Sequence, residues 1–191
     1  MIKQVFLIIA LFTSTLLFSQ NNVSWVLMDK EPITTLTFSK SETLSVNEFS
    51  FQATWDNKLS YSDNLGYYGG ISELKVFKKN KLLQTIKNIE DGIAIGEINI
   101  TFYDYNMDGY IDFSIPIDCS KSCYDNYYLF NPQTENFQHQ KEWAYLKIQE
   151  INKANKQILT VPDGNAKDSE HILYQVEGIK LIKLKIVKIQ K

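Results

Sequence analysis

Hydrophobic and polar residues alternate along most of the chain, with the period of two that is typical of β-strands. The clearest runs are residues 48–55, 97–103 and 111–115, where aromatic and β-branched side chains occupy every second position. Turn-forming residues separate the runs, and no run at the period of a helix is long enough to compete with them. The pattern predicts an all-β fold of antiparallel sheets, arranged as a sandwich or in a propeller-like form.

The last predicted strand, near residues 179–189, differs from the others because lysine interrupts its Ile, Leu and Val residues. The lysines are Lys180, Lys183, Lys185 and Lys188. Lysine on the outermost strand of a sheet hinders pairing with other chains. We therefore interpret this strand as a solvated edge rather than as a binding patch.

Residues 1–20 have the pattern of a secretory signal peptide. Lys3 supplies the positive start, and an apolar run follows from Val5 to Phe18, interrupted only at residues 13–15. The run is too short for a membrane-spanning helix and suits the core of a signal peptide. We predict a periplasmic or secreted protein with no membrane span after cleavage, and one all-β domain over residues 21–191.

The charge balance argues against nucleic acid as a partner. The chain has 20 basic and 22 acidic residues, a net charge of −2, and every basic residue is lysine. A nucleic-acid interface needs a basic surface, and arginine supplies the planar, two-pronged contacts to phosphate. We expect a protein partner instead.

The segment Asp104-Tyr105-Asn106-Met107-Asp108-Gly109-Tyr110-Ile111-Asp112 has the spacing of a calcium-binding loop. Oxygen-bearing side chains stand at positions 1, 3, 5 and 9, and glycine stands at position 6, as in the motif D-x-[DN]-x-[DN]-G. Calcium takes six to eight oxygen ligands, and position 7 supplies a backbone carbonyl. We predict that Ca²⁺ is bound by Asp104, Asn106, Asp108, the carbonyl of Tyr110, and Asp112.

The loop departs from a helical EF-hand in two respects. Position 12 is Ile115 instead of a bidentate glutamate, and the flanking residues alternate as strands do, so we place the loop between two strands. A turn without metal is the alternative, because Asp, Asn and Gly form turns on their own. Three carboxylates within nine residues repel one another unless a cation neutralises them, which favours calcium.

Cys119 and Cys123 are the two cysteines of the chain, in a C-x₃-C spacing. The spacing differs from the C-x-x-C of thioredoxin-type redox proteins, and an exported protein can keep a disulfide. We predict a structural bridge between them that closes a small loop; two free thiols are the alternative.

Tyrosines gather near two loops. Tyr67 and Tyr68 stand among glycines, and Tyr124 follows the cysteine segment. Tyrosine gives a large contact area for little loss of conformational entropy, so we predict that these three residues contact a partner. Packing within strands and core is their alternative role.

Catalytic signatures are weak in this sequence. The two histidines, His139 and His171, stand among polar, turn-like residues, which predicts surface positions, and neither adjoins a nucleophile motif or an H-E-x-x-H zinc motif. A hydrolase with its own pair of carboxylates stays open, because such pairs meet only in space. We expect a binding protein and not an enzyme.

The calcium loop followed by Tyr127-Tyr128-Leu129-Phe130-Asn131-Pro132-Gln133-Thr134-Glu135-Asn136-Phe137 resembles a known family. The family comprises exported, calcium-binding β-proteins related to the immunity proteins of bacterial type IV secretion systems. These proteins block lysozyme-like peptidoglycan hydrolases that rival cells deliver. The resemblance spans roughly residues 95–185 and also includes residues 152–158 and 174–176.

The resemblance implies inhibition of a lysozyme-like hydrolase as the function. Family members insert a Ser-Gly-x-x-Tyr loop into the active-site cleft of the hydrolase, and the matching positions here begin at Ser120 and end at Tyr124, with Lys121 in place of glycine. The alternative function is a calcium-stabilised structural or adhesive module of the cell envelope that has no enzyme target.

Overall fold

The computed structural model describes residues 24–90, 96–119, 123–161 and 170–188. The predicted signal peptide lies outside these residues. Within them the chain is all-β, with one short 3-10 turn, η1 (Met28–Lys30). Among the residues that the structure describes, no helix is long and apolar enough to cross a membrane.

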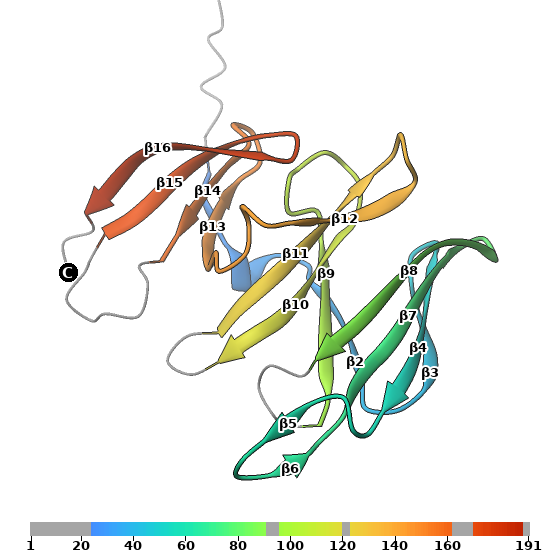
Figure 1. Cartoon of the computed structure of the whole chain (residues 1–191). Helices are drawn as coiled ribbons and strands as arrows, with labels where there is room; N and C mark the ends of the chain where they lie inside the picture. Colours follow the sequence, from blue (N-terminus) through green and yellow to red (C-terminus); the bar gives the residue numbers. More distant parts are fainter. Residues whose placement is uncertain (1–23, 91–95, 120–122, 162–169, 189–191) are drawn as a thin grey trace, which may run out of the picture.

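The strands form three main antiparallel sheets and one small hairpin (Figure 1). The N-terminal sheet has the order β3-β4-β7-β8, with β3 (Glu42–Val46), β4 (Phe49–Asp56), β7 (Gly70–Lys78) and β8 (Lys81–Glu90). The central sheet has the order β12-β11-β10-β9-β2, with β2 (Thr34–Phe38), β9 (Ile98–Tyr103), β10 (Asp112–Cys119), β11 (Cys123–Asn131) and β12 (Asn136–Gln140).

The C-terminal sheet has the order β1-β13-β14-β15-β16, with β1 (Val26–Leu27), β13 (Ile148–Asn152), β14 (Gln157–Thr160), β15 (Glu170–Glu177) and β16 (Lys180–Lys188). The hairpin consists of β5 (Tyr61–Ser62) and β6 (Gly66–Tyr67), which pair antiparallel. It occupies the lower edge of the molecule in Figure 1.

The central sheet contributes to two hydrophobic cores because its side chains alternate between its two faces. Phe102 belongs to the core shared with the N-terminal sheet, where its ring centroid lies 4.9 Å from that of Phe51. Its neighbour Tyr103 belongs to the core shared with the C-terminal sheet, together with the fully buried Trp143. The sheets are therefore layered, with the central sheet between the other two.

This architecture confirms the prediction of an all-β fold with antiparallel sheets, and its layers are sandwich-like. The pattern of residues 97–103 and 111–115 correctly located β9 and β10, which pair with each other across the predicted calcium loop. Alternation identified these strands because each exposes its two faces to different surroundings.

Candidate functional site

The predicted calcium loop joins β9 to β10 and is wound around the carboxylate of Asp104. Asp104 Oδ1 accepts a hydrogen bond from the backbone N–H of Asp108, and Oδ2 accepts one from Gly109, each at 2.9 Å. Gly109 has φ +91°, the left-handed conformation for which glycine is suited. The glycine at position 6 therefore has the conformation that the motif requires.

Asp112, at position 9, ties the loop to the rest of the central sheet. Its side chain is fully buried; Oδ2 accepts from the backbone N–H of Tyr105 at 2.9 Å, and Oδ1 accepts from Phe130 in β11 at 2.8 Å. Asn106 is also buried, and its Nδ2 donates to Asp108 Oδ2 at 2.9 Å. The polar side chains of the loop thus accept hydrogen bonds from the N–H groups of the loop backbone.

Burial and neighbouring charges raise the pKa values of two carboxyl groups of the loop, those of Asp104 and Asp112. Burial, followed by the charges of Asp108 and Asp104, raises the pKa of the Asp112 carboxyl to about 8, against the lowering effect of the Phe130 and Tyr105 N–H groups. Burial is also the main cause that raises the pKa of Asp104. A divalent cation in the loop would reverse this penalty on the charged carboxylates.

The donor set fits calcium in chemical kind and in number. Three carboxylates, one amide oxygen and one carbonyl are the hard oxygen ligands that Ca²⁺ takes, and a carboxylate that accepts one or two N–H groups keeps further lone pairs. Within the described residues, however, no group of three or more His, Cys, Asp or Glu side chains is placed to hold a metal ion. Calcium binding therefore stays a prediction.

A hydrogen-bonded path leads from the loop to the β10–β11 hairpin. The hydroxyl of Tyr105 lies 3.0 Å from Ser114 Oγ in β10, which donates to Asp125 Oδ2 in β11 at 3.3 Å. Tyr105 and Ser114 are buried, and burial raises the pKa of the Asp125 carboxyl against the lowering effect of Ser114. A series of hydrogen-bonded side chains therefore links the predicted calcium loop to β11, the strand that begins at Cys123.

The predicted partner loop is only partly described. Ser120 lies outside the described residues, whereas Tyr124 lies in β11 with its ring centroid 5.6 Å from that of the exposed Tyr145. The backbone places Cys119 and Cys123 directly opposite each other, as register partners at the end of the hairpin. Their side chains lie outside what the structure describes, so the disulfide stays a prediction.

The two other predicted partner residues, Tyr67 and Tyr68, differ in exposure. Tyr67 is 62% exposed and packs edge-to-face on Tyr61 of β5, with centroids 5.1 Å apart; Leu65, in the turn between them, is also 62% exposed. Tyr68 is half-buried, and its N–H donates to the carbonyl of Ser60 at 3.0 Å. The β5–β6 hairpin thus presents apolar side chains to solvent.

The two histidines differ in environment. His139 is exposed as predicted, stacks on Tyr128 at 5.0 Å and lies 3.1 Å from Asn126 Oδ1. The surface prediction is wrong for His171, which is 9% exposed. His171 is the register partner of Val187 in β16, so it stands within a sheet and not in a turn.

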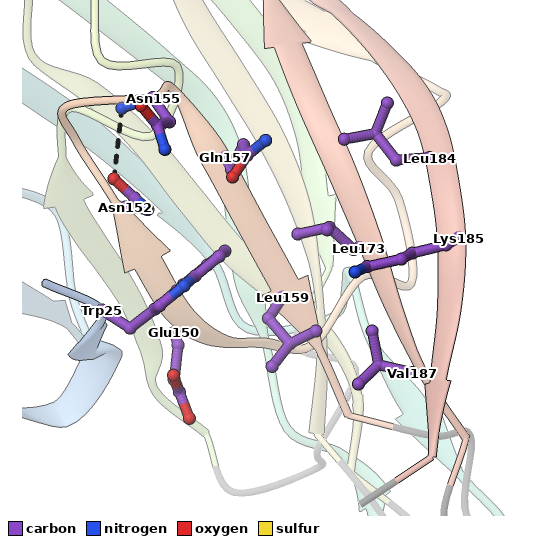
Figure 2. A pocket seen from close by; sticks show the side chains of 10 residues that line it. All are labelled: Trp25, Glu150, Asn152, Asn155, Gln157, Leu159, Leu173, Leu184, Lys185 and Val187. Carbon is purple, nitrogen blue, oxygen red and sulfur yellow. Dashed lines mark hydrogen bonds between the residues drawn. The ribbon is translucent and has the colours of Figure 1, made fainter. Parts of the chain in front are cut away.

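A groove on the C-terminal sheet had no signal in the sequence (Figure 2). Its volume is about 700 Å³, within the range of small-molecule sites, and it combines an indole and aliphatic side chains with amides, a carboxylate and an ammonium. The lining residues are Trp25, Glu150, Asn152, Asn155, Gln157, Leu159, Leu173, Leu184, Lys185 and Val187. They come from the segment before β1, the β13–β14 hairpin, β15 and β16, so the strand order brings them together.

Comparison of the chain with models of known protein families, with curated proteins and with solved structures gives no match. The family resemblance of residues 104–137 is therefore carried forward as a prediction.

Proposed function

We propose that this chain is an exported, calcium-binding protein that binds and inhibits a lysozyme-like peptidoglycan hydrolase, in an immunity-type role. The segment that would contact the hydrolase is the end of the β10–β11 hairpin, with Ser120 and Tyr124. The observation that carries the proposal is the hydrogen-bonded path from the loop through Tyr105 and Ser114 to Asp125, the residue next to Tyr124 in β11. The path connects the predicted calcium loop to the strand that carries Tyr124.

Calcium in the loop would balance the charge of Asp104, Asp108 and Asp112. Asp112 would then stay ionised while it accepts the N–H of Phe130 in β11. Fixing β11 in this way would order the hairpin end that carries Tyr124. A loop that is ordered before binding loses less entropy on binding, which strengthens association.

Inhibition is tested by measuring peptidoglycan hydrolysis by a panel of lysozyme-like muramidases with added protein, in calcium and in chelator. We expect inhibition in calcium, and an inhibition constant raised by about tenfold or more in Tyr124→Ala, as for an aromatic residue at the centre of an interface. Tyr67→Ala, on the β5–β6 hairpin, is the matched control and should inhibit normally. If no muramidase in the panel is inhibited, the proposed target is wrong.

Calcium binding is measured separately, by thermal unfolding across a calcium series. A ligand that binds only the folded state stabilises it by RT ln(1 + [L]/Kd), about 2.7 kcal/mol at one hundred times Kd. The midpoint should rise with calcium in the parent chain and in the control Asp63→Ala, an exposed aspartate of the β5–β6 turn. It should not rise in Asp108→Ala. A midpoint that ignores calcium would make the loop a metal-free turn.

One observation favours the alternative, a structural or adhesive module of the envelope. Tyr61, Leu65 and Tyr67 expose a small apolar patch on the β5–β6 hairpin. In that case the protein should bind isolated cell envelopes, Tyr67→Ala should weaken binding, and Tyr124→Ala should not. The same two variants therefore separate the two functions.

A further inference from the structure

β16 is the outermost strand of the C-terminal sheet (Figure 1). One of its edges pairs with β15 over the whole strand, from Lys180 opposite Glu177 to Lys188 opposite Glu170. Among the described residues no strand pairs with the other edge. That edge presents a row of backbone N–H and C=O groups, which is a template for a further strand.

Apolar side chains are unusually exposed along this strand. Ile182 is 41% exposed, Leu184 47% and Ile186 49%, and Ile179 in the preceding turn is 43% exposed. Lysines keep such an edge from pairing indiscriminately, but they do not require large aliphatic side chains in solvent beside them. Such a strand, both apolar and cationic, could bind a membrane surface or a second copy of the chain. The bulge in β16 argues against the membrane, and the lysine charges argue against the second copy.

A bulge in β16 disfavours the membrane. Tyr174 is opposite Lys183 and Leu173 is opposite Lys185, so the intervening Leu184 has no register partner. Because Leu173 and Tyr174 are consecutive in β15, their side chains point to opposite faces of the sheet, and so do the two lysines. A strand lying on an anionic bilayer needs its cations on one side and its apolar residues on the other.

Charge disfavours a second copy. If two β16 strands paired antiparallel in full overlap, Leu184 would be at the centre and Lys183 of each copy would be opposite Lys185 of the other. Like charges directly opposite each other destabilise a strand pair. A strand with acidic residues at those positions would instead form cross-strand ion pairs on both faces.

We propose that β16 is a docking edge for an extended segment of a partner protein, in which acidic residues are interleaved with apolar ones. The partner strand would hydrogen-bond along the free edge, pair its carboxylates with Lys183 and Lys185, and cover Ile182 and Ile186. The groove described above adjoins the same strand, and Figure 2 shows the Lys185 side chain extending from β16 towards Leu173. Partner side chains on this face would therefore reach the groove as well.

This surface is distinct from the β10–β11 hairpin and does not depend on the proposed hydrolase target. Strand addition of this kind derives affinity from main-chain hydrogen bonds and specificity from alternate side chains. The lysines and aliphatic residues of β16 would select a partner strand that has acidic residues on both of its faces, placed among apolar ones.

The test uses the full mature chain and a capped peptide in which two adjacent Glu residues are flanked by Val and Thr residues. Adjacent residues of a strand point to opposite faces, as Lys183 and Lys185 do. Binding is followed by fluorescence anisotropy. We expect saturable binding that Lys183→Glu/Lys185→Glu weakens by about tenfold or more, since two favourable pairs become repulsive. The control Lys58→Glu/Lys141→Glu changes the net charge equally at exposed sites and should bind normally. Unchanged binding by the β16 variant would overturn the proposal.

A second peptide tests the backbone pairing without altering the protein, so a folding defect cannot mimic the result. N-methylation of alternate residues removes the donors from one edge of the peptide and should abolish binding to the unaltered chain. Equal binding of the methylated peptide, or of a peptide with its Glu residues grouped at one end, would show charge attraction only and overturn strand addition. So would lysine-dependent binding to phosphatidylglycerol vesicles without peptide binding, or a dimer that the β16 substitutions dissociate.

Discussion

Glu31 joins two layers of the molecule through a single carboxylate. It receives hydrogen bonds from the hydroxyl of Tyr103 in the central sheet, at 2.8 Å, and from the ammonium of Lys153 in the β13–β14 turn. Lys153 also lies over the Tyr103 ring, 5.5 Å from its centroid. Burial alone would raise the pKa of Glu31, but the two hydrogen bonds and the Lys153 charge lower it below its ordinary value of 4.5.

The lowered pKa of Glu31 predicts a pH-dependent contribution to stability. Because the folded-state pKa lies below the unfolded one, the contribution is complete above about pH 4.5 and is lost as the pH falls through the folded-state value. We expect Glu31→Gln to lower the free energy of unfolding by about 1–2 kcal/mol near pH 7, since Lys153 is more than half exposed and water screens its charge.

Urea unfolding from about pH 7 to about pH 3 measures this difference. The gap between the parent chain and Glu31→Gln should narrow as the pH falls. Asp29→Asn is the matched control, because the Asp29–Lys30 pair is exposed on both sides and contributes little. A gap that stays constant with pH would show that the Glu31 charge is not responsible.

Single residues were predictable from the sequence where a motif fixes the backbone. Gly109 has the positive φ that position 6 requires, and Asp112 stands at the start of the strand that alternation predicted. The second role of Asp112, as acceptor for Phe130 eighteen residues away, was not predictable, because it depends on strand pairing. His171 was misassigned for the same reason: polar neighbours in sequence do not show which strand will cover a residue.

At the scale of elements, the β10–β11 hairpin brings Cys119 and Cys123 together. Residues directly opposite each other in an antiparallel pair have Cα atoms about 4.5–5.5 Å apart, within the range of about 4.4–6.8 Å that a disulfide spans. The register therefore supports the bridge that the spacing and the export signal predict. A five-residue loop closed in this way would stabilise the fold by about 2 kcal/mol through the entropy of the unfolded chain.

Thiol alkylation without reductant, followed by mass spectrometry, should leave both cysteines unlabelled in protein from an oxidising compartment. Reductant should lower the unfolding midpoint of the parent chain, and Cys119→Ser/Cys123→Ser should have the lower midpoint with or without it. Full labelling of the folded protein would contradict the bridge. A reductant effect that persists in the double variant would have another cause.

The elements themselves were predictable to different degrees. β9 and β10 alternate clearly because one face of each packs in the first core, while most residues between these core positions are polar. The core residues are Ile98, Ile100, Phe102, Phe113 and Ile115. The groove on the C-terminal sheet was not predictable, since Trp25 precedes β1 while Lys185 lies in β16, at the other end of the sheet. Sequence periodicity gives the faces of a strand, whereas strand order decides which faces become neighbours.

At the scale of the whole molecule, the central sheet contributes side chains to both hydrophobic cores. Phe51 and Phe102 belong to the first core, and Ile158 and Trp143 belong to the second. If the N-terminal sheet detached, the central sheet would expose one apolar face to water while it still had to support the other core. The cost of that exposure couples the two cores and predicts that residues 24–188 unfold as one cooperative unit.

Two tryptophans report separately on the two cores. Trp55 packs against the first core, and Trp143 is fully buried in the second. We make two variants, each keeping one of these residues as its only tryptophan. In each, the urea midpoint measured by fluorescence should equal the midpoint of global unfolding, because loss of either core exposes the central sheet that the other core packs on. Each tryptophan replacement also changes stability, so its midpoint is compared with the circular dichroism midpoint of the same variant.

Core truncations make the coupling quantitative. Phe51→Ala in the first core and Ile158→Ala in the second should each lower stability by about 2–5 kcal/mol, since both side chains are fully buried. In a coupled molecule, each truncation lowers the midpoint reported by the tryptophan of the opposite core as well as by its own. If Phe51→Ala moved only the Trp55 transition and left Trp143 unchanged, the layers would be separate domains. The single-domain prediction would then fail. The boundary would first be sought at the calcium loop, where Asp112 accepts hydrogen bonds from Tyr105 of the second core and Phe130 of the first.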